Sequence, residues 1–180
     1  MKRPEWGAHF RAETGLSPGI FLSRLPPLAG APIHLARAHN LRDRHGPVHG
    51  GAFLRERRIL FDCTRAEFPR IFVHELFHFV WLRLGNPARL LFERLIADEV
   101  RRAPGELGWA AESRKRKLTR ADGQLRTRRW REYCCESFCD TAAWLYSGAV
   151  AHPEFTLGRF WRERRRKWFD RTLGGGKLSI

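Results

Sequence analysis

The stretch EFPRIFVHELFHFVWLRL, residues 67–84, determines how the rest of the chain is interpreted. It is too long for a strand, and its apolar side chains would cover nearly the whole circumference of a helix. We therefore predict a helix that is buried in the middle of the domain. Asn86 and Pro87 end it and supply the N-cap and first-turn proline of a following helix. Further helices are predicted over residues 88–102, 131–146 and 157–173.

The buried helix contains the sequence His74-Glu75-Leu76-Phe77-His78. Residues four apart lie about 40° from each other around a helix axis, so both imidazoles project from one face and can bind one metal ion. This is the HExxH arrangement, in which the histidines bind zinc and the glutamate accepts a proton from water. The alternative is a pair of core histidines with a glutamate between them by chance. Burial of three polar groups without partners is costly, which favours one Zn²⁺ per chain.

A catalytic zinc needs a third protein ligand and keeps its fourth position open for water. Glu136 and Asp140 are four residues apart in YCCESFCDTAAWLY, residues 133–146, where the other side chains are mostly apolar or small. On a helix both carboxylates would face the same side. They are the carboxylate candidates for completing the site.

The two motifs together resemble a known family. HELFH followed by ESFCDTAAWL is similar to the gluzincin metallopeptidases, the thermolysin-like group, and in compact form to the ImmA/IrrE family. The similarity covers about residues 48–147. It implies a zincin-like α+β fold, in which a small, mostly antiparallel sheet packs on the HExxH helix and additional helices complete the domain.

The resemblance also implies a function and a set of roles. It implies zinc-dependent hydrolysis of peptide bonds by a metal-activated water, in the manner of a regulatory protease that acts on a specific protein. By position in the motifs, the metal ligands would be His74, His78 and Glu136, the general base Glu75, and the outer partner of His74 would be Asp140.

The sequence leaves alternatives for the third metal ligand and for the donor that stabilises the oxyanion. HELFHFVW also resembles the SprT-like proteases, which would need a third histidine downstream, and His152 is the histidine available there. The oxyanion formed during hydrolysis usually needs a further donor, for which Tyr133 and His152 are candidates. A cysteine ligand is also possible, because Cys134, Cys135 and Cys139 flank Glu136.

The region before the buried helix predicts a small sheet. Apolar runs at residues 52–54 and 58–62 are separated by Arg55-Glu56-Arg57, a pattern that favours a hairpin or a pair of strands. An extended substrate could add a strand at its edge. The preceding residues, 1–47, are expected to be rich in loops.

With 180 residues and 43% apolar side chains, the chain is long enough for one domain with a single core. We predict one zincin-like domain over residues 1–180. Its expected parts are a loop-rich N-terminal part (1–47), a metallopeptidase core (48–147), a basic insertion within that core (105–130) and a C-terminal helix (153–173).

The chain is strongly basic, with 34 Lys and Arg against 19 Asp and Glu. Most of the excess lies in residues 113–131 and 158–171, which would attract anionic partners. A second hypothesis is therefore a zinc-containing nucleic-acid-binding protein that uses this Arg-rich surface, with Trp130, Trp161 or Trp168 stacking on bases.

The sequence also bears on the compartment. Charged residues such as Glu5 and Arg11 interrupt any secretory signal near the start, and no apolar run is long enough to cross a membrane. The four cysteines form no CxxC pair, and reduced thiols are expected. We predict a cytoplasmic protein with no membrane span.

Overall fold

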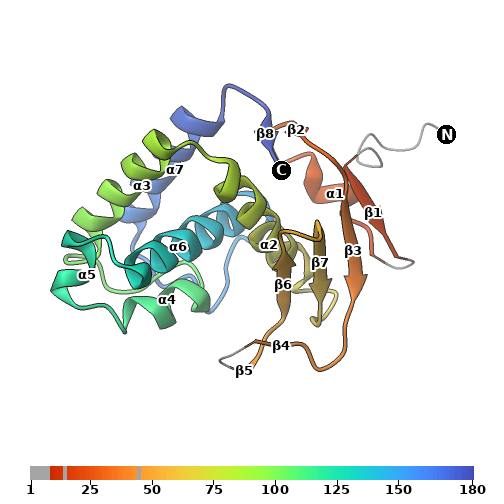
Figure 1. The fold of residues 1–180 in the computed structure, drawn as a ribbon, viewed down its shortest axis with the longest axis horizontal. Coiled ribbons are helices and arrows are strands. Elements are labelled where there is room, and N and C mark those ends of the chain that lie inside the picture. Colours follow the sequence, from red (N-terminus) through yellow and green to blue (C-terminus); the bar gives the residue numbers. More distant parts are fainter. Residues whose placement is uncertain (1–8, 14–15, 44–45) are drawn as a thin grey trace.

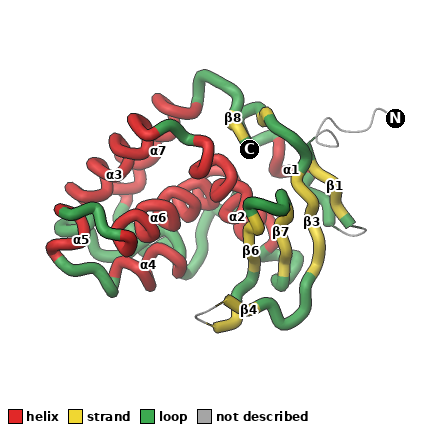
Figure 2. Tube along the Cα trace, in the orientation of Figure 1, coloured by secondary structure: helices red, strands yellow, loops and turns green. Residues whose placement is uncertain are grey.

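Helix α2 (Phe68–Arg83) runs through the centre of the structure, with strands on one side and most of the other helices on the other (Figures 1 and 2). The computed structural model describes residues 9–13, 16–43 and 46–180. A proline in the first turn begins α2, and ten consecutive or nearly consecutive side chains between Phe68 and Val80 are buried. The expected central helix is therefore present, within one residue of its predicted ends.

The main sheet has four strands in the order β1 (Phe10–Ala12), β3 (Ile33–Arg37), β7 (Arg58–Phe61) and β6 (Gly50–Phe53). The predicted hairpin is confirmed, because β6 and β7 pair in antiparallel fashion. Strands β1 and β3, and β3 and β7, pair in parallel. The expectation of a mostly antiparallel sheet is therefore wrong: the α+β fold contains a mixed sheet.

The parallel pairing follows from the path of the chain. Between β3 and β7 the chain reverses twice, once before β6 and once in the β6–β7 turn, so β3 and β7 run in the same direction. Ile33 and Leu35 point into the core and His34 points outward, as in a half-buried strand. The N-terminal part, expected to be mainly loops, thus supplies two of the four strands in this sheet.

Smaller elements complete the strand side. Strands β4 (Arg42–Asp43) and β5 (Gly46–Pro47) form a short antiparallel pair, and β2 (Leu28–Ala29) pairs in parallel with β8 (Leu178–Ser179). Helix α1 (Gly19–Leu22) is a single turn. The β2–β8 pair attaches the end of the chain to its N-terminal third.

The helical side follows the sequence prediction closely in three places. Helices α3 (Asn86–Glu99), α6 (Arg128–Tyr146) and α7 (Arg159–Leu173) match the predicted helices to within a few residues. Two short helices, α4 (Trp109–Lys115) and α5 (Arg120–Gln124), lie in the basic segment whose pattern gave no prediction. Helix α6 packs along α2, and α4 packs on α6 (Figure 1).

Aromatic rings join the helices around α2. Phe138 of α6 lies with its ring centroid 5.7 Å from that of Phe77 of α2, 5.0 Å from Phe169 of α7 and 5.5 Å from Phe92 of α3. All four side chains are fully buried. Such ring pairs add to the stabilisation that burial of their area supplies, so they fix the spacing between α2 and α6.

A buried ionic network holds the outer helices together. Arg165 of α7 has no exposed surface and donates hydrogen bonds to Glu99 of α3, to Glu106 before α4 and to Thr141 of α6. Tyr133 of α6 also donates to Glu106. Because burial of these charges is tolerated only while they are paired, the network fixes α3, α6 and α7 against the segment that leads into α4.

Within the described residues, we find no helix with both the length and the apolar character that a membrane crossing requires.

Substitution of Arg165 should test this network. In Arg165→Met the carboxylates of Glu99 and Glu106 lose their buried partner, and the free energy of unfolding should fall by about 3–5 kcal/mol. The exposed Arg171 on the same helix gives the matched control: Arg171→Met should change it by less than about 0.5 kcal/mol. Urea unfolding of the three proteins measures both values, and equal stabilities would contradict the proposed importance of the network.

Candidate metal centre

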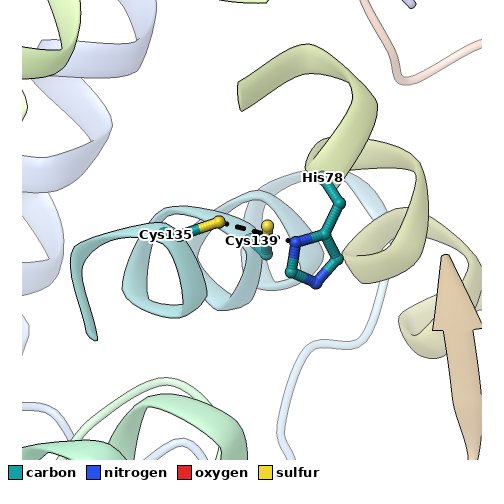
Figure 3. A group of neighbouring side chains, drawn as sticks. All are labelled: His78, Cys135 and Cys139. Carbon is teal, nitrogen blue, oxygen red and sulfur yellow. Dashed lines mark hydrogen bonds between the residues drawn. The ribbon is translucent and has the colours of Figure 1, made fainter. Parts of the chain in front are cut away.

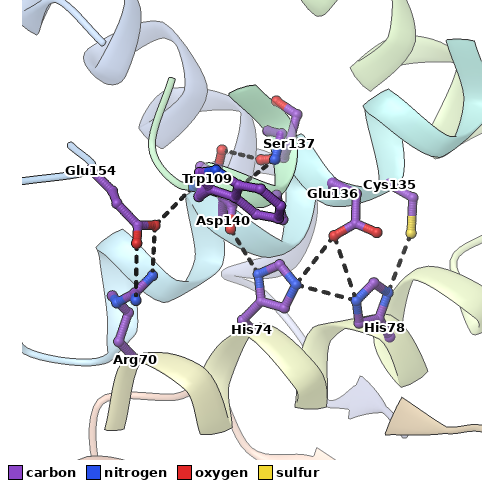
Figure 4. A network of polar contacts seen from close by, with 12 residues as sticks. Arg70, His74, His78, Trp109, Cys135, Glu136, Ser137, Asp140 and Glu154 are labelled. Carbon is purple, nitrogen blue, oxygen red and sulfur yellow. Dashed lines mark hydrogen bonds and ion pairs between the residues drawn. The ribbon is translucent and has the colours of Figure 1, made fainter. Parts of the chain in front are cut away.

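Helix α2 brings two imidazoles together. His74 and His78 lie one turn apart, and their Nε2 atoms are 3.3 Å from each other (Figure 4). The sequence places both on the side of α2 that faces α6, in agreement with the spacing argument. Their exposure is low, because α6 covers this side.

Glu136 of α6 approaches the same point. Its Oε2 atom lies 3.2 Å from Nε2 of His74 and 3.9 Å from Nε2 of His78. Around a tetrahedral zinc with bonds of about 2.0–2.1 Å, neighbouring ligand atoms are separated by about 3.3 Å. The two imidazole nitrogens and the carboxylate oxygen therefore have the chemistry and nearly the spacing to hold one ion, and these three residues are one of the groups that could bind a metal.

Asp140 fixes the first imidazole. Its Oδ1 atom lies 2.7 Å from Nδ1 of His74, and its Oδ2 atom accepts the backbone N–H of Ala111 at 3.0 Å (Figure 4). A carboxylate on Nδ1 holds the proton there and directs the lone pair of Nε2 toward the centre. This is the outer position that the resemblance implies for Asp140.

The backbone before α4 lies directly against this carboxylate. A Cβ atom built on Gly108 would lie 2.3 Å from Oδ1 of Asp140, closer than any side chain tolerates. The backbone of Gly108 is extended, so the need for glycine here comes from the close approach alone. Glu154 holds the same segment by accepting the backbone N–H of Trp109 at 2.8 Å and pairing with Arg70 of α2 at 3.1 Å.

Arg114 of α4 is a site residue that the sequence analysis missed. Its Nη2 atom lies 2.9 Å from Oε1 of Glu136, while Oε2 of the same carboxylate faces the histidines. The ion pair thus leaves one carboxylate oxygen for a metal. In the sequence Arg114 is one of nine basic residues between positions 113 and 131, and nothing in that pattern distinguishes it.

Glu75 lies beside the histidines on α2 and is 8% exposed. Burial raises the pKa of its carboxyl group, and the positive histidines and a hydrogen bond from the backbone of Ala52 oppose this only in part. A raised pKa suits a carboxylate that must accept and return a proton. The close approach of β6 depends on Gly50, where a Cβ atom would lie 3.0 Å from Cγ of Glu75.

The ligand residues are strongly coupled electrostatically. Burial disfavours the charged form of His78, yet Cys135 and Glu136 raise its pKa to about 9; Asp140 likewise holds the pKa of His74 well above its usual value against burial. Burial also opposes ionisation of Glu136, but both histidines and Arg114 lower its pKa to about 2. Without metal the centre therefore holds protons that a metal ion must displace.

The centre opens into a cavity of about 640 Å³. Strand β6 lines it through Gly50, Gly51 and Phe53, and α4 contributes Trp109, which is 61% exposed. The cavity is thus bounded by a sheet edge on one side and by an aromatic side chain on another. Its lining includes His74, Glu75, His78, Arg114, Glu136 and Asp140.

The structure does not place the two candidate oxyanion donors in this cavity. Tyr133 is fully buried and donates to Glu106, in the network of Arg165, and burial holds its pKa well above the usual value. His152 lies 3.3 Å from Oε1 of Glu67, and neither Tyr133 nor His152 belongs to the lining. The structure therefore brings neither residue to the centre, and both roles stay predictions, as does the alternative in which His152 joins the two histidines.

The basic segments are partly neutralised within the molecule. The side chain of Trp130 is 2% exposed, so it is not available to stack on a base. The indole of Trp168 packs edge-on against Phe92, with ring centroids 4.9 Å apart. The guanidinium of Arg164 lies over the ring of Trp161, with its Cζ atom 5.1 Å from the ring centroid. Several arginines pair with acidic residues, as in Arg126–Glu93, Arg128–Glu132 and Arg164–Asp98.

Comparisons with known proteins found no family model, no curated protein and no solved structure that matches this chain. The geometry of the centre and the resemblance of its two motifs therefore provide the support for a function.

Substitution of Gly108 should test the outer part of the centre. In Gly108→Ala the new methyl group must displace the carboxylate of Asp140, so zinc affinity should fall by about 10–100-fold, the usual effect of losing an outer partner of a ligand histidine. Gly175→Ala is the matched control, because a Cβ atom there would meet nothing within 4 Å. Competition with a chromophoric chelator measures both affinities, and an unchanged affinity in Gly108→Ala would show that Asp140 does not support the site.

Proposed function

We propose that this protein is a zinc-dependent metallopeptidase of the gluzincin type. The observation that carries the proposal is the convergence of Nε2 of His74, Nε2 of His78 and Oε2 of Glu136, with Glu75 lining the same cavity. Two imidazoles and one carboxylate are a ligand set that catalytic zinc sites use. The resemblance of HELFH and ESFCD to this group supports the same assignment.

His74, His78 and Glu136 would hold the ion. A zinc ion bound there acts as a Lewis acid that polarises a peptide carbonyl and makes water more acidic. Asp140 keeps Nε2 of His74 free to bind, and Arg114 orients Glu136 so that a single oxygen faces the centre. Both are positioning residues in this proposal.

Glu75 would transfer a proton from the attacking water to the leaving amine. Its carboxylate accepts a proton from the attacking water as the oxygen of that water bonds to the peptide carbon. The same carboxyl group then gives the proton to the nitrogen of the leaving amine as the C–N bond breaks. The partly raised pKa of Glu75 supports both halves of this transfer.

Strand β6 would position the substrate. It is an edge strand of the main sheet and lines the cavity, so an extended peptide can pair with it as an additional strand. The exposed rings of Phe53 and Trp109 offer apolar contacts to the side chains of such a peptide. We further propose that the enzyme acts in the cytoplasm on a specific protein, as the resemblance implies for a regulatory protease.

Nucleic-acid binding through residues 113–131 and 158–171 is the weaker alternative. It depends on net charge and on aromatic side chains for stacking, and Trp130 is buried. Arg114 within the first segment is engaged by Glu136, and Arg165 within the second is fully buried. The peptidase proposal explains the polar groups on α2, whereas the alternative assigns them no catalytic role.

Substitution of Glu75 gives the direct test of this function. Glu75→Gln should keep zinc, because Glu75 is not a proposed ligand, and should lower the rate of peptide hydrolysis by about 10²–10⁴-fold, the range that general-base catalysis supplies. The control is Glu163→Gln on α7, outside the cavity.

The assay uses zinc-loaded protein and a pool of quenched fluorescent peptides of mixed sequence, with and without a chelator. Parent protein and Glu163→Gln should cleave the pool only without chelator. Cleavage by Glu75→Gln at the parent rate would disprove the role of Glu75, and no cleavage by the zinc-loaded parent would count against a peptidase.

A further inference from the structure

Two cysteines of α6 face the metal centre from its outer side. Cys135 and Cys139 are one turn apart, and Sγ of Cys135 lies 3.5 Å from Nδ1 of His78 (Figure 3). That nitrogen is opposite the Nε2 atom which faces Glu136. Cys139 is fully buried. One donor atom from each of the three residues lies within 4.8 Å of the others.

This spacing suits a metal ion as well as a hydrogen bond. With bonds of about 2.3 Å to sulfur and about 2.0–2.1 Å to nitrogen, a tetrahedral ion separates a thiolate from an imidazole nitrogen by about 3.5 Å. The distance from Sγ of Cys135 to Nδ1 of His78 is 3.5 Å. Little movement of these two side chains would be needed to admit an ion.

The thiols of Cys135 and Cys139 cannot readily form a disulfide with each other. Residues four apart on a helix have Cβ atoms about 5–6 Å apart, whereas a disulfide needs about 3.5–4.5 Å. Cys135 and Cys139 both lie inside α6, so a disulfide would require the helix to unwind. Both sulfurs therefore remain available as ligands.

We propose that His78, Cys135 and Cys139 form a second metal site, for a thiophilic ion such as Cu(I) or Cd(II). Two thiolates and one imidazole form a softer ligand set than the two imidazoles and one carboxylate on the other side of His78, and soft ions select sulfur. On binding, each thiol releases its proton to solvent.

The two sites share one residue. A neutral imidazole has a single lone pair for a metal, so His78 can bind one ion through Nδ1 and another through Nε2 only if its ring N–H proton is also removed. An ion at the thiolate site therefore weakens zinc binding at the His74–Glu136 site. This consequence rests on the proposed peptidase centre, but the existence of the thiolate site does not.

The test is a titration of reduced, metal-free protein with Cd²⁺, followed by thiolate-to-cadmium charge-transfer absorption. The parent should bind one Cd²⁺ per chain with this absorption, and Glu136→Ala should keep it, because Glu136 belongs to the other ligand set. Cys139→Ser and Cys135→Ser should each lose about half of the absorption or more. Cys63→Ser is the matched control and should equal the parent, since Cys63 lies outside the group.

The ¹¹³Cd NMR chemical shift of the parent protein provides a test that does not depend on whether the variants fold. A shift typical of sulfur ligands supports the site, and a shift typical of nitrogen and oxygen ligands alone overturns it. Absorption that is absent in the parent, or unchanged in both Cys135→Ser and Cys139→Ser, also overturns it. None of these readouts measures peptide hydrolysis, so failure here leaves the proposed peptidase standing. Preloading with Cd²⁺ should also lower the zinc retained by the parent more than that retained by Cys139→Ser.

Discussion

The hydrogen bond between His74 and Asp140 joins α2 to α6, and it lies where both helices are buried. Helix α2 carries His74, Glu75 and His78 within an apolar stretch, and burial of such groups is unfavourable unless each has a partner. Helix α6 supplies partners for the two histidines through Glu136 and Asp140, and the backbone of Ala52 on β6 contacts Glu75. The packing of the two helices and the formation of the centre are therefore one event, and a shift of α6 along α2 would disturb both.

The outer parts of the fold hold this pair in register. Ala111 of α4 donates its backbone N–H to Asp140, and the segment before α4 is fixed by Glu106, which belongs to the buried network of Arg165. Residues 105–130 would look like a surface insertion from their charge. The structure instead places Trp109, Ala110 and Arg114 of this segment in the wall of the cavity, where Arg114 contacts Glu136.

Local patterns in the sequence predicted α2, α3, α6, α7 and the β6–β7 hairpin, because periodicity and turn residues act over short distances. The sheet order escaped prediction, since the pairing of β3 with β7 joins segments more than twenty residues apart. Helical spacing placed His74 and His78 on one face of α2, and the resemblance of the two motifs implied that Glu136 and Asp140 would meet them. Tyr133, a candidate oxyanion donor from the sequence, instead donates its hydroxyl hydrogen bond to Glu106, a contact that depends on where a distant segment of the chain lies.

The proposed function depends on Glu136 completing a zinc site with the two histidines of α2. The most direct measurement is the metal content of purified protein by elemental analysis, for the parent, for Glu136→Ala and for Glu132→Ala, one turn earlier on α6. We expect about one zinc per chain in the parent and in Glu132→Ala, and a clear loss in Glu136→Ala. Equal zinc in Glu136→Ala and the parent, or no zinc in any of the three, would contradict it.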